Sequence, residues 1–272
     1  MGERSIVDYY NQFDEWGRLD REPIEFLVNW HYMRSSLPAQ GHILDIGAGP
    51  GKYAMALAQH GYEVTLADLT PRLVDIARGK AEELGLTKQF RGFHAADATD
   101  LSRFDDQAFD AALMLGPLYH LQEEADRSRA ASELHRITKR GGLVFVAFMT
   151  RPRHLMTSLA EPLNWKPNHE PEGITSFAQT GTFNHTDEGR FTGAYYYEIE
   201  TIEPFMEAHG FRTIQLIGSS SIAGSMRGER FDYWHSFGEE RFRSIMDLVY
   251  REAANRFNLG ASSHLLYIGR AE

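Results

Sequence analysis

The sequence predicts an α/β fold built on a mainly parallel sheet, and two observations support that prediction. From His42 to about Met149, short apolar runs with β-branched residues alternate with amphipathic stretches that end at glycine. This is the pattern of repeated strand–helix–strand units. The chain has 272 residues, 42% of them hydrophobic, so one elaborated domain over residues 1–272 can bury a sizeable core.

Five strands are expected in the core at residues 41–149, and each leads into a turn or helix signal. They are expected at residues 42–46, 63–68, 90–95, 109–115 and 142–148. The helices between them have local causes. Thr70 can cap a helix whose first residue is Pro71, and Gly85 can end that helix. A further helix over residues 123–137 carries the chain back across the sheet.

After residue 149 the core is interrupted and then resumes. Residues 150–200 form an insertion with a hairpin around a turn at 187–189. Residues 201–217 and 263–270 return to the core with a helix and two more strands. They flank a largely helical insertion at 218–262.

Residues 1–38 precede the core as an N-terminal helical cap of two helices, the second opening near Pro23. We expect this cap and the two insertions to meet as a lid over the carboxyl ends of the strands. Open α/β sheets bind their ligands there.

Composition excludes several classes of protein. The chain has no cysteine, which removes disulfides and thiolate chemistry. Its formal charge is -10, and its Lys and Arg residues are scattered, so nucleic acid is not an expected partner. No apolar run approaches the roughly 18 residues of a membrane span, and no signal peptide is visible. A cytoplasmic protein without membrane contact is therefore expected. No metal is expected either, because neither His-x-x-x-His nor His-Glu-x-x-His occurs.

The strongest motif joins the first strand to the helix after it. It reads His-Ile-Leu-Asp-Ile-Gly-Ala-Gly-Pro-Gly-Lys from residue 42 to 52, so that Asp45 precedes Gly47, Gly49 and Gly51. Glycines at these places let the backbone turn tightly and approach a ligand. A pyrophosphate loop would have its third glycine one residue later and no acid at the strand end. A cationic ligand suits Asp45 better.

This motif resembles motif I of the class I S-adenosylmethionine-dependent methyltransferases, and the resemblance extends over about residues 41–149. It implies S-adenosyl-L-methionine as the cofactor. It also implies a Rossmann-like sheet of seven strands with the last antiparallel and helices on both faces, to which the insertions would add an α+β lid.

The resemblance assigns further cofactor contacts in chain order. Asp68 would accept both ribose hydroxyls, and Asp97 would receive the adenine amino group. Leu69 and Ala98 would enclose the adenine, and Leu115 would lead into the loop beside the methyl group. The alternatives are a helix-capping acid at Asp68, an ordinary loop aspartate at Asp97 and plain packing at the apolar positions.

The N-terminal segment offers one more cofactor contact. In many small-molecule methyltransferases such a helix folds over the cofactor, and Tyr10 is the residue expected to do so here. The alternative is an amphipathic helix that docks on the sheet without a ligand.

The loop after the fourth strand carries the candidate catalytic residues, Tyr119 and His120. Either could orient the acceptor or remove its proton, although a histidine that opens a helix is often structural. His185 and His235 are the next candidates for a base. The loop lacks the Asn-or-Asp-Pro-Pro-Tyr tetrad with which nucleic-acid enzymes hold a flipped base.

Aromatic residues crowd the insertions, and a lid lined by them would suit a small aromatic or cationic acceptor. Packing within the lid is the stronger interpretation. They are Trp165, Phe177, Phe183, Tyr195, Tyr196, Tyr197, Phe231, Tyr233, Trp234 and Phe237.

The predicted function is methyl transfer from S-adenosylmethionine to a small organic molecule through a nitrogen, oxygen, sulfur or carbon acceptor atom. Two alternatives stay open. One is a nicotinamide-dependent oxidoreductase, and the other is a family member that binds the cofactor without transferring methyl. The sequence selects no acceptor molecule and no oligomeric state.

Overall fold

The structure is a computed structural model that describes residues 3–12, 14–162, 170–184 and 193–272. Its main sheet has seven strands in the order β3-β2-β1-β4-β5-β9-β8. The strands are β1 (His42–Ile46), β2 (Glu63–Asp68), β3 (Phe90–Ala95), β4 (Phe109–Met114), β5 (Thr138–Met149), β8 (Phe211–Gly218) and β9 (His264–Ala271). β9 runs antiparallel to both neighbours, β5 and β8, and the other ladders are parallel. The predicted sheet, with its antiparallel last strand, is confirmed.

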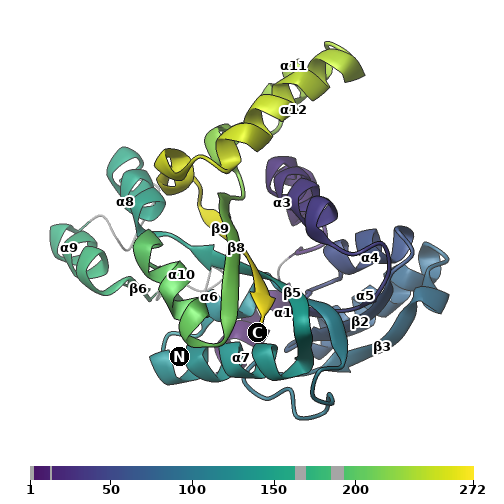
Figure 1. Ribbon diagram of the computed structural model, residues 1–272. Helices are drawn as coiled ribbons and strands as arrows, with labels where there is room; N and C mark the ends of the chain where they lie inside the picture. Colours follow the sequence, from purple (N-terminus) through teal and green to yellow (C-terminus); the bar gives the residue numbers. More distant parts are fainter. Residues whose placement is uncertain (1–2, 13, 163–169, 185–192) are drawn as a thin grey trace.

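Helices cover both faces of this sheet (Figure 1). They are α1 (Glu3–Gln12), α2 (Arg18–Arg21), α3 (Pro23–Ser36), α4 (Lys52–Gln59), α5 (Pro71–Glu83), α6 (Pro117–His120), α7 (Glu124–Ile137), α8 (Arg151–Ala160), α9 (Pro171–Thr180), α10 (Ile199–Ala208), α11 (Glu229–His235) and α12 (Glu239–Ala253). Three 3₁₀ turns complete the set: η1 (Thr87–Gln89), η2 (Ser221–Ala223) and η3 (Arg256–Ala261).

Side-chain alternation along the strands divides the core into two layers. Ile43 belongs to a layer shared with α3, α4, α5 and α12. Its neighbour Leu44 belongs to the opposite layer, shared with α7 and α10. Successive strand residues point to opposite faces, so the apolar run of β1 fills both layers at once.

One strand prediction and one helix-cap prediction differ from the structure in ways that matter for the core. β5 begins at Thr138 rather than at residue 142, and the glycines expected as a turn lie inside it. The register with β4 jumps there, because Phe109 pairs with Thr138 while Ala111 pairs with Leu143. Thr70 precedes α5 as predicted, but its side chain makes no capping hydrogen bond.

The predicted hairpin is present as a separate two-stranded sheet. β6 (Thr182–Phe183) pairs antiparallel with β7 (Ala194–Tyr195). The turn predicted at 187–189 lies outside the described residues. The short helix α2 lies between the two predicted N-terminal helices and was not predicted.

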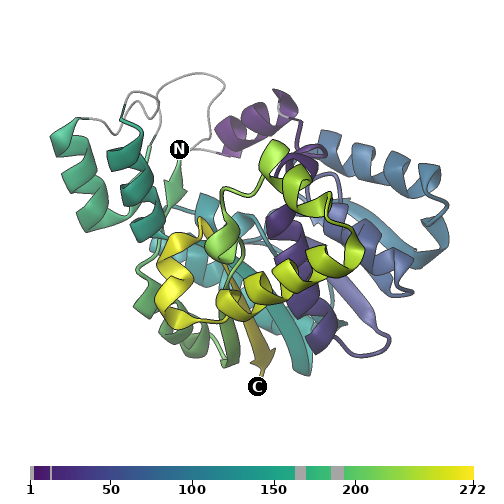
Figure 2. The same ribbon diagram turned by 90° about the horizontal axis from the view of Figure 1, so that it is seen from above.

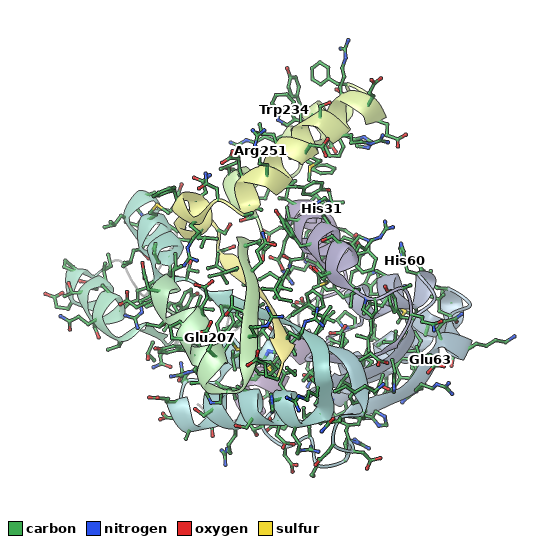
Figure 3. All side chains as sticks on the ribbon, viewed as in Figure 1. His31, His60, Glu63, Glu207, Trp234 and Arg251 are labelled. Atoms are coloured by element: carbon green, nitrogen blue, oxygen red, sulfur yellow. The ribbon has the colours of Figure 1, made fainter. Side chains whose placement is uncertain are left out.

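The late insertion extends away from the sheet. Trp234 lies on this extension, and His31 lies on α3 beside α12 (Figure 3). The His31 ring stacks on Tyr250 with centroids 3.9 Å apart, and the Tyr32 hydroxyl donates to the Tyr250 carbonyl (2.6 Å). These contacts anchor α12 to α3. From above, α8–α9 lie at one side of the molecule and the yellow-green late insertion crosses it (Figure 2).

In the described part of the chain, every helix is too short or too polar to cross a membrane.

Candidate active site

A cavity of about 130 Å³ opens at the carboxyl ends of β1, β2 and β4. We call it the strand-end cavity. Of the predicted site residues, these line it: Tyr10, Asp45, Gly47, Gly49, Asp68, Leu69, Asp97, Ala98, Leu115, Tyr119 and His120. Gly51 alone among the predicted set does not. A Cβ added at Gly51 would lie 2.9 Å from Leu66 Cδ1, so this glycine allows α4 to pack closely on β2.

Asp68 ties the glycine loop to the end of β2. The amide N–H of Gly49 donates to its Oδ2 (2.7 Å), and the amide of Thr70 donates to its Oδ1 (2.8 Å). The alternative role of a helix cap is not present, because Thr70 precedes α5 and no side chain caps that helix. Each carboxylate oxygen has a second lone pair, so Asp68 can still accept a hydroxyl from a ligand.

Glycine is favoured at three points of the loop. Gly47, Gly49 and Gly51 have φ values of +66°, +56° and +88°, which L side chains seldom adopt. A Cβ at Gly47 would also collide with the ring of Pro117. Backbone geometry thus fixes the shape of the loop, and Gly47 and Gly49 line the cavity.

Asp45 is buried, with 2% of its surface exposed, and its Oδ2 has no hydrogen-bond partner among the described residues. Burial, reinforced by the neighbouring Asp68 carboxylate, raises the pKa of Asp45 to about 7. An unpaired buried carboxylate is costly unless a cation joins it. Asp45 therefore fits a ligand with a positive charge, as S-adenosylmethionine has.

Asp97, Leu69 and Ala98 lie around the part of the cavity beyond β2 and β3. The Asp97 carboxylate accepts the amide N–H of Thr99 (2.8 Å), which fixes its orientation in the loop. The arrangement gives an apolar surface with one acid beside it, and this fits an adenine with its amino group.

Tyr10 and His120 meet across the strand-end cavity. The Tyr10 hydroxyl and His120 Nε2 are joined by a 2.9 Å hydrogen bond, and the rings meet edge to face. Burial lowers the pKa of His120 to about 4. At neutral pH this imidazole is uncharged and a weak base, because an ordinary histidine has a pKa of about 6.5.

A second cavity, of about 690 Å³, lies where the three additions to the core meet. We call it the cap cavity. The N-terminal segment contributes Glu22, Ile24 and Glu25, and the middle insertion contributes Arg153, His154, Thr157 and Tyr196. The late insertion contributes Gly224, Met226 and Arg227, and β9 contributes His264. Among the described residues, the strand-end cavity is lined from these additions by the N-terminal segment alone. The expected lid thus forms around the second cavity.

A polar network links the linings of the two cavities, and sequence reasoning missed it. His264 Nδ1 lies 3.1 Å from Glu25 Oε2, and Glu25 Oε1 faces the Arg18 guanidinium at 3.4 Å. Arg18 Nε also donates to Glu15 (2.7 Å). The ring of Tyr119 lies 5.5 Å from that of His264. Glu25 and His264 are 239 positions apart, so no local motif could have signalled the pair.

Most of the insertion aromatics pack, as the stronger interpretation predicted. Phe177, Phe183 and Tyr196 are buried together around His154. Tyr196 also lines the cap cavity, whereas Tyr197 faces the opposite layer of the core.

The remaining candidates in the insertions lie away from both cavities or outside the described residues. Tyr233, Trp234 and Phe237 are exposed. His235 stacks on Phe231. Trp165 and His185 lie outside the described residues.

Comparisons with known proteins agree with this geometry. Residues 44–146 match a family model described as a methyltransferase domain. A ubiquinone biosynthesis O-methyltransferase of Xanthomonas axonopodis pv. citri is 31% identical over 125 residues, which cover 46% of this chain and 50% of the relative. One of the same name from Coxiella burnetii is 27% identical over 186 residues, covering 64% of this chain and 75% of the relative. The chain thus spans half the length of the first relative.

A solved structure shares the fold. It is the 1,6-didemethyltoxoflavin-N1-methyltransferase of Burkholderia thailandensis, which contains bound 1,6-didemethyltoxoflavin and S-adenosylhomocysteine. Its TM-score is 0.57 at 14% identity, and the match covers 99% of this chain and 86% of that one.

Proposed function

Because the chain belongs to the class I S-adenosylmethionine-dependent methyltransferases, we propose that it transfers a methyl group to a small organic acceptor held in the cap cavity. The observation that carries this proposal is the adjacency of two cavities, whose linings meet at the contact between Arg18 and Glu25. The cofactor residues line the first, and the three additions to the core enclose the second. The family match removes the nicotinamide-dependent alternative.

The residues of the strand-end cavity act by binding and alignment. When bound, the cofactor supplies a methyl group already activated by its sulfonium charge. Asp45 balances a positive charge of the cofactor, and Asp68 accepts hydroxyls while it holds the glycine loop. Tyr10 covers the cavity from the N-terminal side. Alignment and exclusion of water are the main contributions that such a reaction needs from the protein.

The acceptor side favours a molecule with both apolar and polar parts. Ile24, Met226 and Tyr196 give the cap cavity apolar surface, while His154, Arg153 and His264 give it polar groups. The two relatives named above are O-methyltransferases of quinone biosynthesis by name. We therefore propose an acceptor with an aromatic or conjugated ring that carries a hydroxyl. The cytoplasmic location and the absence of a nucleic-acid partner stay predictions.

The test combines binding with transfer. Calorimetry should show that the wild-type protein binds S-adenosylmethionine and that Gly49→Val does not. Incubation with methyl-labelled cofactor and a small-molecule extract should then give a labelled product that is absent with Gly49→Val. Binding without any labelled product would favour a family member that does not transfer methyl. Absence of binding would reject the proposal.

A further inference from the structure

We propose that Glu25 and His264 are the base that removes a proton from a hydroxyl acceptor in the cap cavity. This inference rests on the proposed function and adds to it an ionisable oxygen acceptor and a specific catalytic pair. Its basis is the 3.1 Å contact between His264 Nδ1 and Glu25 Oε2 at the wall of that cavity.

The contact fixes which nitrogen of His264 is available. Burial opposes ionisation of Glu25, but Arg18 and His264 outweigh it and hold the pKa of this carboxyl well below its usual range. A carboxylate can only accept hydrogen bonds. Nδ1 must therefore carry the proton, which leaves the lone pair of a neutral ring on Nε2. This is the orientation by which an acid–histidine pair prepares a base.

His264 is also accessible enough to meet a substrate. Its side chain is 19% exposed, and that of Glu25 is 14% exposed. Within the described chain, the contact with Glu25 is the one hydrogen bond that the His264 ring makes. The ring is thus held by Glu25, and His264 lines the cap cavity.

The charges around the pair favour a proton on His264 after transfer. Arg18 lies between two carboxylates, Glu15 and Glu25, so the ionised trio has one negative charge in excess. An imidazolium at His264 would balance it. Other titratable or charged groups lie around the pair on the elements packed against it. They are Tyr119 and His120 near the ring, Arg153 and His154 on α8, Glu161 just after α8, and the Glu22–Arg227 ion pair.

Two other histidines near the cavities are weaker candidates. His120 is bonded to Tyr10, and burial lowers its pKa to about 4. His154 lines the cap cavity, but burial lowers its pKa to about 4 as well. A base works best when its pKa lies near the working pH. Only His264 combines a carboxylate partner with a place on the cavity wall, among the histidines that the structure describes.

The proposed step balances as follows. The hydroxyl proton of the acceptor passes to His264 Nε2 while the acceptor oxygen forms a bond to the methyl carbon. The carbon–sulfur bond breaks, and its electron pair stays on sulfur as S-adenosylhomocysteine forms. The imidazolium, paired with the Glu25 carboxylate, later releases its proton to water.

The first measurement needs no natural acceptor. Long-range ¹⁵N spectra of the histidine rings, assigned with His264→Gln, should show His264 at neutral pH as the Nδ1–H tautomer with an unprotonated Nε2. In Glu25→Gln, the carboxylate that requires a donor at Nδ1 is gone, so the share of the Nδ1–H tautomer should fall. A proton on Nε2 in the wild-type protein, or a tautomer balance that Glu25→Gln leaves unchanged, overturns the assignment.

The second measurement uses 4-nitrophenol, whose anion is yellow, as the acceptor probe with saturating S-adenosylmethionine. The wild-type protein should bind it partly as the anion at a pH where the free phenol is mostly protonated. His264→Gln should bind it uncharged and lower kcat by about 10² to 10⁴-fold. Its affinity for S-adenosylmethionine should stay within about twofold of the wild type, since the ring lines the other cavity.

The controls separate a base from a structural role. His60→Gln, at the end of α4, should behave as the wild type in both measurements. Glu25→Asp should recover part of the activity lost in Glu25→Gln, and the loss in Glu25→Gln should fall on kcat rather than on the KM for 4-nitrophenol. Wild-type turnover in His264→Gln overturns the inference, and so does a wild-type protein that fails to bind the phenol. In either case, binding of S-adenosylmethionine by the wild-type protein would leave the proposed function intact. Failure of the wild-type protein to bind S-adenosylmethionine would reject the proposed function itself.

Discussion

The substitution Asp45→Asn keeps the shape of the side chain and removes its charge, and it should separate stability from cofactor binding. In the protein without ligand, the Asp45 carboxylate is buried with an oxygen that lacks a partner among the described residues. Burial, then the charge of Asp68, raises its pKa from 3.8 to about 7. Because the folded value is the higher one, ionisation opposes folding. Stability from this group is complete below pH 4 and is lost as pH rises to about 7.

The magnitude follows from that shift. Each pKa unit corresponds to about 1.4 kcal/mol. Between pH 5 and pH 8, the free energy of unfolding of the wild-type protein should therefore fall by about 2 to 3 kcal/mol relative to Asp45→Asn. The comparison with the isosteric variant cancels most other titrations. Any fixed cost of burying the amide is the same at both pH values.

Urea unfolding of both proteins between pH 5 and pH 8 measures this difference, and calorimetry at pH 8 measures affinity for S-adenosylmethionine. We expect Asp45→Asn to bind at least about tenfold more weakly, since one buried charge contact is worth more than 1.4 kcal/mol. The matched control is Asp75→Asn on α5, an exposed carboxylate paired with Arg78 (2.7 Å). Exposed ion pairs contribute little to stability. The difference in the free energy of unfolding between the wild type and Asp75→Asn should therefore stay nearly constant with pH. A stability difference between wild type and Asp45→Asn that does not change with pH would refute the reasoning.

Three further predictions concern the strand-end cavity. Gly49→Val should destabilise the protein by about 1 to 2 kcal/mol, because its φ of +56° is left-handed, and calorimetry should detect no cofactor binding by the folded fraction. Asp68→Ala should leave the amides of Gly49 and Thr70 without their acceptor and weaken cofactor binding by about 1 to 3 kcal/mol; unchanged calorimetric affinity would contradict this. His120→Gln should keep turnover within about tenfold at pH 7 to 9, measured by methyl transfer, because its pKa of about 4 makes it a poor base there; a loss of 10³-fold would restore His120 as the base.

The sheet could be predicted from the sequence because its signals are local. β1, β2 and β3 have the predicted bounds, and the signals are clearest for β1 and β2, which are short apolar runs that end at Gly47 and Asp68. Local signals failed where pairing decided the outcome. β5 begins at Thr138 because Phe109 of β4 pairs with it across an irregularity of register. A ladder partner thirty residues away leaves no mark on the nearby sequence.

The strand-end cavity could be predicted for the same reason. Asp45 and Asp68 end neighbouring parallel strands, so the rule that ligands bind at carboxyl strand ends places them together. Their spacing in the chain is the spacing of one strand–helix–strand unit. Gly51 shows the limit of this reasoning. It belongs to the same motif, yet it serves the packing of α4 on β2 rather than the cavity.

The acceptor side follows a different logic, which explains why Glu25 and His264 were missed. The cap cavity is assembled from the N-terminal segment, the two insertions and the start of β9, and no periodicity relates these segments. What joins them is burial of charge. Glu25 is paired with Arg18 from its own side and with His264 from the other end of the chain, because a carboxylate enclosed by the cap must find partners there. The cofactor cradle depends on the strand ends, whereas the acceptor wall depends on the additions. Substitutions in the additions can therefore change the acceptor while the glycine loop and its two acids stay the same.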